Sequence, residues 1–169
     1  MAYRTKTYIS ADWTGDQNAV DQLHKWNDSD HWGLSFNDAH DITEANDGSL
    51  NCSIKASLAT RLDVSKTFVL IVGNGTRTRR AGECNYCAYY SNGSCTKGHG
   101  VSNKSFIEYE CDKAVRDGIS IIVLYNAAKI DKSKCIDSVK DKGTHTAMQY
   151  IKDGQRYWDY QAVKNAFGQ

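Results

Sequence analysis

The stretch SFIEYECDKAVRDGISIIVLYN, residues 105–126, carries the clearest indication of the fold class. Its first half carries apolar residues at helical spacing and places Ile107, Cys111 and Ala114 on one face. A glycine ends this pattern, and the apolar run 119–124 that follows has the composition of a buried strand. A helix that leads directly into a buried strand is typical of βαβ units, from which parallel sheets are built.

Outward from this stretch, apolar runs alternate with helical patterns along the chain. The expected strands are residues 6–11, 33–37, 67–73, 119–124 and 144–151, and the expected helices are residues 16–26, 53–62 and 157–167 together with one that begins near residue 105. This alternation predicts right-handed crossovers and an α/β fold with an open, doubly wound, mostly parallel sheet. We expect a single domain over residues 1–169, with ligands bound beyond the carboxyl ends of the strands.

Composition gives little reason to expect a charged polymer or a membrane as partner. The chain has 169 residues, with 21 Lys and Arg against 20 Asp and Glu and a net charge of +1, so neither nucleic acid nor an anionic membrane is indicated. No apolar run approaches the roughly 18 residues of a membrane span, and the first residues lack the apolar centre of a signal peptide. The expected location is the cytoplasm, where the six cysteines would stay reduced.

Two glutamates, Glu108 and Glu110, stand in the first turns of the helix near residue 105. Residues two apart on a helix point about 200° apart, so only one of the two carboxylates can face a given cleft. Acidic groups there interact well with the helix dipole, which is the simplest account of both. Core positions on either side of Glu110 favour partial burial and a functional role, but the residues alone leave the choice open.

Several motifs in register resemble a known family. KTYIS (6–10), SIKASLATRLDVSKTFVLIVGNGT (53–76) and the opening stretch are similar to the TIR-like domains typified by ThsB proteins of Thoeris antiphage systems. That pattern has an aromatic–Ser first strand, a strand that ends in V-L-I-G-x-x-T, a W-V-x-x-E helix start and a G-x-x-I-I strand. Phe106 stands here in place of the Trp. The resemblance covers residues 5–126 and implies a flavodoxin-like three-layer fold.

By this resemblance, Glu110 is the catalytic residue of NAD⁺ cleavage. A single carboxylate suits that chemistry because nicotinamide leaves as a neutral base and positive charge develops on the ribose. The resemblance further implies an ADP-ribose-derived signal molecule, cyclic when the substrate's own adenine or ribose hydroxyl captures the ribose carbon. The resemblance also implies two partners, an effector protein activated by the product and a phage-derived trigger. It further implies assembly into homo-oligomers.

Residues at the predicted strand ends are candidates for the substrate pocket, because a base needs an aromatic wall and ribose needs hydrogen-bond acceptors. They are Ser10, Asp12, Trp13, Phe36, Asp38 and Thr76, and His40 could join them. The alternative is that the aromatics form the edge of the core and the aspartates cap loops. Arg77, Arg79 and Arg80 could meet a pyrophosphate together with Thr76, although a solvated basic loop explains them more simply.

The segment CNYCAYYSNGSCTKGH spaces Cys84, Cys87, Cys95 and His99 as ligands of a structural zinc ion are spaced. It lies in a polar loop, 74–104, that is longer than loops without internal order usually are, and a metal would supply the missing core. This Cys/His-containing insert departs from the family pattern. Free thiols in a disordered loop are the alternative.

Two other classes of function stay open at this point. The chain could be a catalytically silent TIR-like module that binds a partner protein. The Cys/His loop and the neighbouring arginines could instead belong to a zinc-stabilised nucleic-acid binder, although the net charge counts against this alternative.

Overall fold

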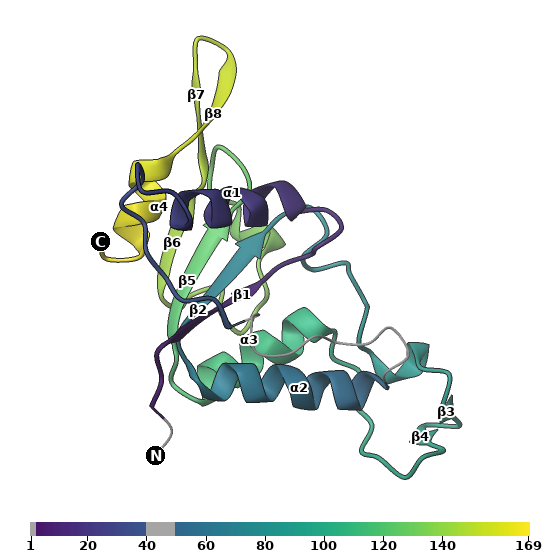
Figure 1. The fold of residues 1–169 in the computed structure, drawn as a ribbon. Coiled ribbons are helices and arrows are strands. Elements are labelled where there is room, and N and C mark those ends of the chain that lie inside the picture. The colour runs from purple at the N-terminus through teal and green to yellow at the C-terminus, as the bar shows by residue number, and fades with distance from the viewer. Residues whose placement is uncertain (1–2, 40–49) are drawn as a thin grey trace.

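The computed structural model describes residues 3–39 and 50–169 and contains a four-stranded sheet between two layers of helices (Figure 1). The strand order is β1–β2–β5–β6, with β1 at Lys6–Ser10, β2 at Ser65–Val72, β5 at Ser120–Tyr125 and β6 at Thr144–Ala147. All three strand pairs are parallel. The predicted α/β class with an open, doubly wound, mostly parallel sheet is therefore confirmed.

The predicted strand at residues 33–37 is wrong. Only one parallel bridge, between Thr7 and Asp38, joins this segment to β1. The reason is that side chains take up its backbone donors: the Phe36 amide donates to Asn27 Oδ1 at 2.7 Å and the Ser35 amide to Gln169 Oε1 at 2.8 Å. The segment nonetheless passes along the free edge of β1, where a flavodoxin-like sheet has its second strand.

Two helices cover each face of the sheet (Figure 1). Helices α1 (Gln17–Asn27) and α4 (Tyr160–Ala166) lie on one face, and α2 (Asn51–Asp63) and α3 (Phe106–Arg116) lie on the other. The central strands are buried on both sides, because Phe68 and Leu70 of β2 point to α2 and α3 whereas Val69 and Ile71 point to α1 and α4. This is why residues 68–72 of β2 and 121–125 of β5 form continuous buried runs rather than alternating ones.

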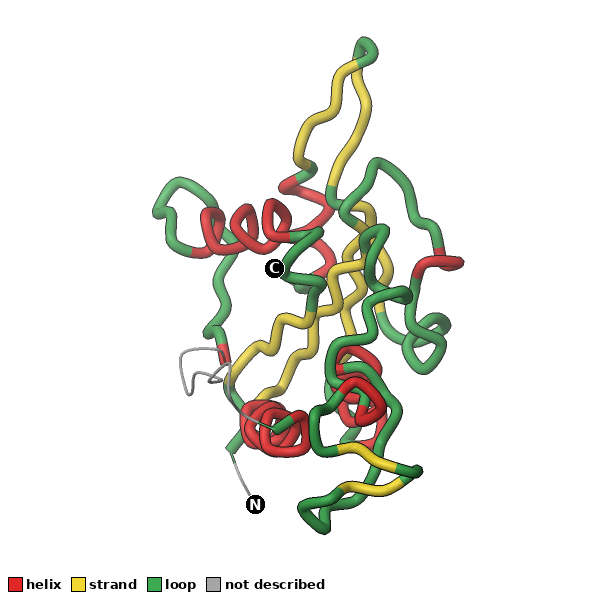
Figure 2. Tube along the Cα trace, turned by 90° about the vertical axis from the view of Figure 1, so that its right-hand side faces the viewer, coloured by secondary structure: helices red, strands yellow, loops and turns green. Residues whose placement is uncertain are grey.

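The end of the chain differs in detail from the expected strand and helix. The backbone leaves the sheet after β6 and forms a hairpin of β7 (Gln149–Lys152) and β8 (Gln155–Trp158), which projects from the body of the molecule (Figure 2). Its two-residue turn has positive φ at Asp153 and Gly154, the conformation that suits such turns. The last helix begins at Tyr160 because Asp159 caps it by accepting from the Ala162 amide.

The insert 74–104 lies at one end of α2 and α3 (Figure 1). Its regular structure is limited to a short 3₁₀ turn, η2 (Cys84–Tyr86), and a small hairpin of β3 (Tyr90–Ser91) and β4 (Ser94–Cys95); a second such turn, η3 (Lys132–Lys134), follows β5. Among the described residues, no helix is long and apolar enough to cross a membrane.

Candidate active site

The start of α3 is fixed by a capping box. Ser105 Oγ accepts from the Glu108 amide at 3.1 Å, and Glu108 Oε2 accepts from the Ser105 amide at 3.0 Å. Glu108 Oε1 also accepts from Arg80 Nη1 at 3.2 Å. Glu108 therefore has a structural role at the helix terminus, as the simplest interpretation of a first-turn acid requires.

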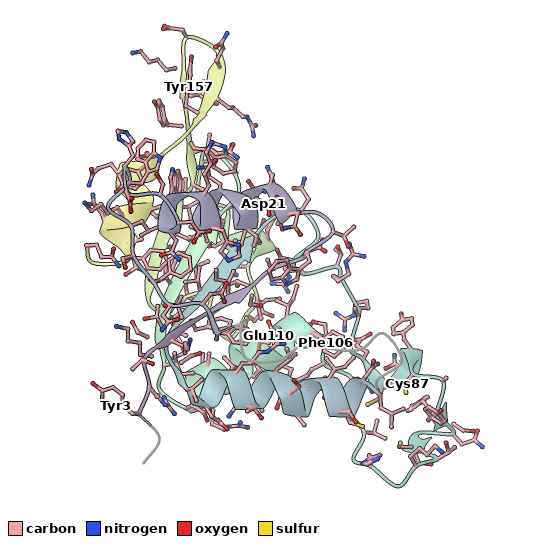
Figure 3. All side chains as sticks on the ribbon, in the orientation of Figure 1. Tyr3, Asp21, Cys87, Phe106, Glu110 and Tyr157 are labelled. Carbon is pink, nitrogen blue, oxygen red and sulfur yellow. The ribbon has the colours of Figure 1, made fainter. Side chains whose placement is uncertain are left out.

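Glu110 lies on the side of α3 that faces the sheet and is only 7% exposed (Figure 3). Tyr8 donates its hydroxyl to Glu110 Oε1 at 2.9 Å, and Ser10 donates its hydroxyl to Oε2. The two donors are two residues apart on β1, so they share one face of the strand. Both carboxylate oxygens are thus held from the neighbouring strand.

The chemical state of the Tyr8 phenol supports this arrangement. Burial raises its pKa well above the ordinary value, and the nearby Glu110 charge raises the pKa further. The phenol therefore keeps its proton and remains a hydrogen-bond donor to Glu110 over the physiological range.

Glu110 forms part of a cleft of about 390 Å³. The loop that follows β1, helix α2, the first part of the insert and the first turns of α3 form its walls. The lining side chains include Asp12, Trp13, Leu58, Arg61, Arg79, Phe106 and Glu110. The volume is within the range of about 300–1,000 Å³ that is usual for small-molecule sites.

Asp12 contributes a second carboxylate, which is paired with an arginine. Arg79 donates from Nε to Asp12 Oδ1 at 3.1 Å and from Nη2 to Oδ2 at 3.2 Å, a bidentate geometry. A side-chain carbon at Gly75 would overlap this carboxylate, so only glycine lets the turn after β2 approach it. The pair places one fixed negative and one fixed positive group at the cleft wall.

The structure thus brings three of the predicted site residues, Asp12, Trp13 and Glu110, into one cleft. Ser10 does not line the cleft but donates a hydrogen bond to Glu110 from strand β1. Two cleft-related residues were missed from the sequence, Tyr8 and the 5% exposed Arg61 of α2. The spacing of Tyr8 and Ser10 by two residues on a strand was the signal for the first. Arg61 follows Leu58 by three residues and so falls on the inward side of α2, which was the signal for the second.

Three other predicted pocket residues do not line this cleft. Thr76 is buried and closes the turn after β2 by accepting from the Gly73 amide at 2.8 Å. Phe36 stacks on Phe167 with ring centroids 5.6 Å apart. Asp38 pairs with His24 at 2.6 Å, a hydrogen bond that raises the pKa of the histidine. His40 lies outside the described residues.

The arginines that follow Thr76 also have protein partners. Arg77 pairs with Asp137 at 2.7 Å, and Arg80 pairs with Glu83 and Glu108. Only Arg79 of the three lines the Glu110 cleft. The basic run therefore serves mainly to tie the insert to the rest of the domain.

The predicted zinc ligands Cys84, Cys87, Cys95 and His99 line a common cavity of about 10 Å³. Cys52 of α2 lines the same cavity. Within residues 3–39 and 50–169, however, no three His, Cys, Asp or Glu side chains are arranged to hold a metal ion. The side chains as placed do not fit a zinc ion, and zinc binding stays a prediction for metal analysis of the purified protein.

These features define a class of protein: a three-layer α/β domain with a helix-borne carboxylate at the carboxyl edge of a parallel sheet. Residues 8–83 match a protein family described as the Thoeris protein ThsB, TIR-like domain. The match confirms the resemblance that the sequence motifs indicate and relates the chain to a Thoeris defence protein. No curated protein matches the chain.

The matched residues stop short of Glu110 but include two residues whose hydroxyls donate to it. Tyr8 and Ser10 lie within the matched range, and each donates a hydroxyl to the glutamate from about a hundred residues away. Residues within the family match therefore contact the candidate catalytic residue, which lies outside it.

Proposed function

We propose that the chain is a TIR-type enzyme that cleaves NAD⁺ in the Glu110 cleft and makes an ADP-ribose-derived signal, cyclic in form, for antiphage defence. The observation that carries the proposal is the buried Glu110 carboxylate, which Tyr8 and Ser10 hold at the cleft wall. An effector protein activated by the product, a phage-derived trigger and assembly of several copies belong to the same proposal.

The chemistry requires one well-oriented carboxylate. The bond between ribose C1′ and the nicotinamide nitrogen breaks, and its electron pair leaves with nicotinamide as a neutral base, so no general acid is needed. Positive charge develops on the ribose and is stabilised by a carboxylate that faces it. Because Tyr8 and Ser10 already orient Glu110, little reorganisation accompanies the reaction.

A carboxylate accepts hydrogen bonds, so the Glu110 side chain is of the right chemical type to contact the ribose hydroxyls of the substrate. Water attack at C1′ would give ADP-ribose and a proton, whereas attack by the substrate's own adenine or ribose hydroxyl would give a cyclic isomer that is lighter by one water.

Other cleft side chains suit the rest of the dinucleotide. Trp13 and Phe106 offer aromatic surface for a base. Arg61 and Arg79 bring positive charge for the pyrophosphate, and Asp12 orients Arg79.

The experiment that tests the proposal is NAD⁺ consumption, with mass analysis of the products, for the wild type and for Glu110→Gln. Both proteins are assayed with and without lysate from phage-infected cells, since turnover can require a trigger. We expect the wild type to turn over NAD⁺ and the variant to lose at least about a hundredfold.

Glu108→Gln is the matched control, because it changes the same residue type two positions away on the same helix. Glu108 caps α3 and is not part of the Glu110 cleft, so its variant should keep turnover. Equal turnover in the wild type and Glu110→Gln would remove Glu110 from the mechanism. Absence of turnover in the wild type under both conditions would favour the catalytically silent interaction module.

A further inference from the structure

A second cavity, of about 700 Å³, lies at the same edge of the sheet. Its walls are the residues just before α1, the turn after β2, the segment after β5 and the β7–β8 hairpin. The turn Gly73–Gly75 contributes to it and also touches both aspartates of the loop after β1. A side-chain carbon at Gly73 would overlap the Asp16 carboxylate, and one at Gly75 would overlap that of Asp12. Asp12 belongs to the Glu110 cleft, whereas Asp16 belongs to this second cavity.

Asp16 is the unusual group in the second cavity. It is only 3% exposed, and its Oδ1 accepts from Asn126 Nδ2 at 2.9 Å, but its Oδ2 has no hydrogen-bond partner among the described residues. A buried carboxylate oxygen without a donor is costly and calls for an explanation. A ligand that brings an N–H or O–H group would supply the missing donor.

Hydrogen-bonded side-chain amides hold Asp16 in position. Asn126 also donates to Asn18 Oδ1 at 3.0 Å and accepts from Gln149 Nε2 at 3.0 Å. These contacts use both polar ends of the Asn126 side chain, so Asn126 cannot turn to satisfy Asp16 Oδ2. Asp16, which lines the cavity, is therefore held with one buried carboxylate oxygen unpartnered among the described residues.

Positive charge lines the rest of the cavity. Lys129, Lys134 and Arg156 contribute to its walls, together with the single further acid Asp131. Lys134 donates to Asn74 Oδ1 at 2.7 Å and lies 4.0 Å from Asp131, whereas Lys129 and Arg156 form no ion pair within the part of the chain that the structure describes. A ligand for this cavity needs an anionic end for the cations and a donor end for Asp16.

Size and apolar surface narrow the class of ligand. Tyr125 and Ile151 also line the cavity and add apolar surface, which suits a flat base. A free phosphate ion would use the cations only and would leave Asp16 unsatisfied. We propose that this cavity is a second nucleotide-binding site, in which the phosphate contacts Lys129 and Arg156 and an N–H or O–H group of the base or ribose donates to Asp16.

The test is calorimetric titration of the whole protein with AMP and with GMP. We expect saturable binding at one site per chain. Lys129→Ala combined with Arg156→Ala should weaken binding about tenfold or more, because charge-assisted hydrogen bonds to the phosphate are lost. Both residues are exposed, so the folded state should be unaffected, and a thermal melt checks this. Asp16→Asn should weaken binding as well, because the amide cannot accept at both positions.

Two controls separate this site from its alternatives. Lys152→Ala removes an exposed cation of the same hairpin that does not line the cavity, and it should leave binding unchanged. Glu110→Gln should also bind AMP as the wild type does, whether or not the chain cleaves NAD⁺. The proposal is overturned if neither nucleotide binds, if inorganic phosphate binds as tightly as AMP, if Lys152→Ala weakens binding as much as the double variant, or if Glu110→Gln abolishes binding.

Discussion

At the scale of single residues, Glu108 and Glu110 show how neighbours of the same type take on different roles. Glu108 accepts from the backbone of its own helix, whereas Glu110 accepts from two hydroxyls of strand β1. The difference follows from the helical rotation of about 200° between positions two apart. The Glu108 carboxylate therefore caps the helix, whereas the Glu110 carboxylate lies at the cleft.

Tyr8→Phe tests how much the orientation of Glu110 matters. The phenylalanine ring keeps the packing against Phe68 but removes the donor to Glu110 Oε1. We expect a loss of about 1 kcal/mol in the free energy of unfolding, measured in urea, because a buried acceptor loses its partner. NAD⁺ turnover should fall as well, if Glu110 acts as proposed. Tyr3→Phe, at an exposed position, is the control, and equal effects of the two changes would contradict the prediction.

Asp16→Asn tests the cost of the unpartnered carboxylate. Burial raises the pKa of Asp16, the Asn126 hydrogen bond opposes this, and the Asp12 charge adds to the rise. The folded state therefore favours the protonated acid, so wild-type stability is higher below the ordinary pKa and falls as pH rises through the folded-state pKa.

The asparagine variant has no such charge to bury. We expect it to be more stable than the wild type at pH 7, by about 1 kcal/mol, and this advantage to shrink toward pH 4. Urea midpoints across this range measure the difference, with the exposed Asp30→Asn as control. A constant difference at all pH values would count against ionisation as the cause.

At the scale of secondary structure elements, the position of helix α3 determines where Glu110 lies. The helix begins at Phe106 because the side chains of Ser105 and Glu108 each accept a hydrogen bond from the other's backbone amide. A start one residue earlier or later would place its carboxylates about 100° away from their present directions.

Ser105→Ala should lower the free energy of unfolding by about 1 kcal/mol, because the first turn of α3 loses its N-cap acceptor. Ser105→Asp keeps an acceptor at the same position and should retain most of the stability. Urea denaturation of the three proteins compares them directly. If the alanine and aspartate variants lose the same amount, the cap does not stabilise this helix.

At the scale of the whole molecule, the carboxyl edge of the sheet carries two cavities, and the Gly73–Gly75 turn packs against one aspartate of each. The Glu110 cleft lies toward α2 and α3, and the Asp16 cavity lies toward the segment after β5 and the β7–β8 hairpin. The turn is packed against two carboxylates that precede it by about sixty residues. Changes in this turn should therefore affect both cavities.

Gly73→Ala should be destabilising by about 1–3 kcal/mol, because the added carbon would overlap the buried Asp16 carboxylate. Gly100→Ala is the matched control, since a carbon there meets nothing within 4 Å. Combining Gly73→Ala with Asp16→Ala should cost less than the sum of the two single changes, because the overlapping group is gone. Additive losses in thermal or urea unfolding would show that the overlap is not the source of the cost.

Features that depend on local patterns could be predicted from the amino-acid sequence. Helical spacing located α1, α2 and α3 to within two residues, continuous apolar runs located β2 and β5, and a motif in register singled out Glu110. Such signals are local, because periodicity and capping act between residues a few positions apart.

Contacts between side chains that are far apart in the sequence could be identified only in the folded structure. The strand expected at 33–37 did not form because side chains outside the segment accept from its backbone amides: Asn27, nine residues before Phe36, and Gln169, 134 residues after Ser35. Phe36, Asp38 and Thr76 turned to contacts away from the cleft, whereas Tyr8 and Arg61 became part of the site. The hydrogen bond between Tyr8 and Glu110 joins residues about a hundred positions apart. Such contacts depend on how the helices and the sheet pack, and local sequence patterns do not reveal them.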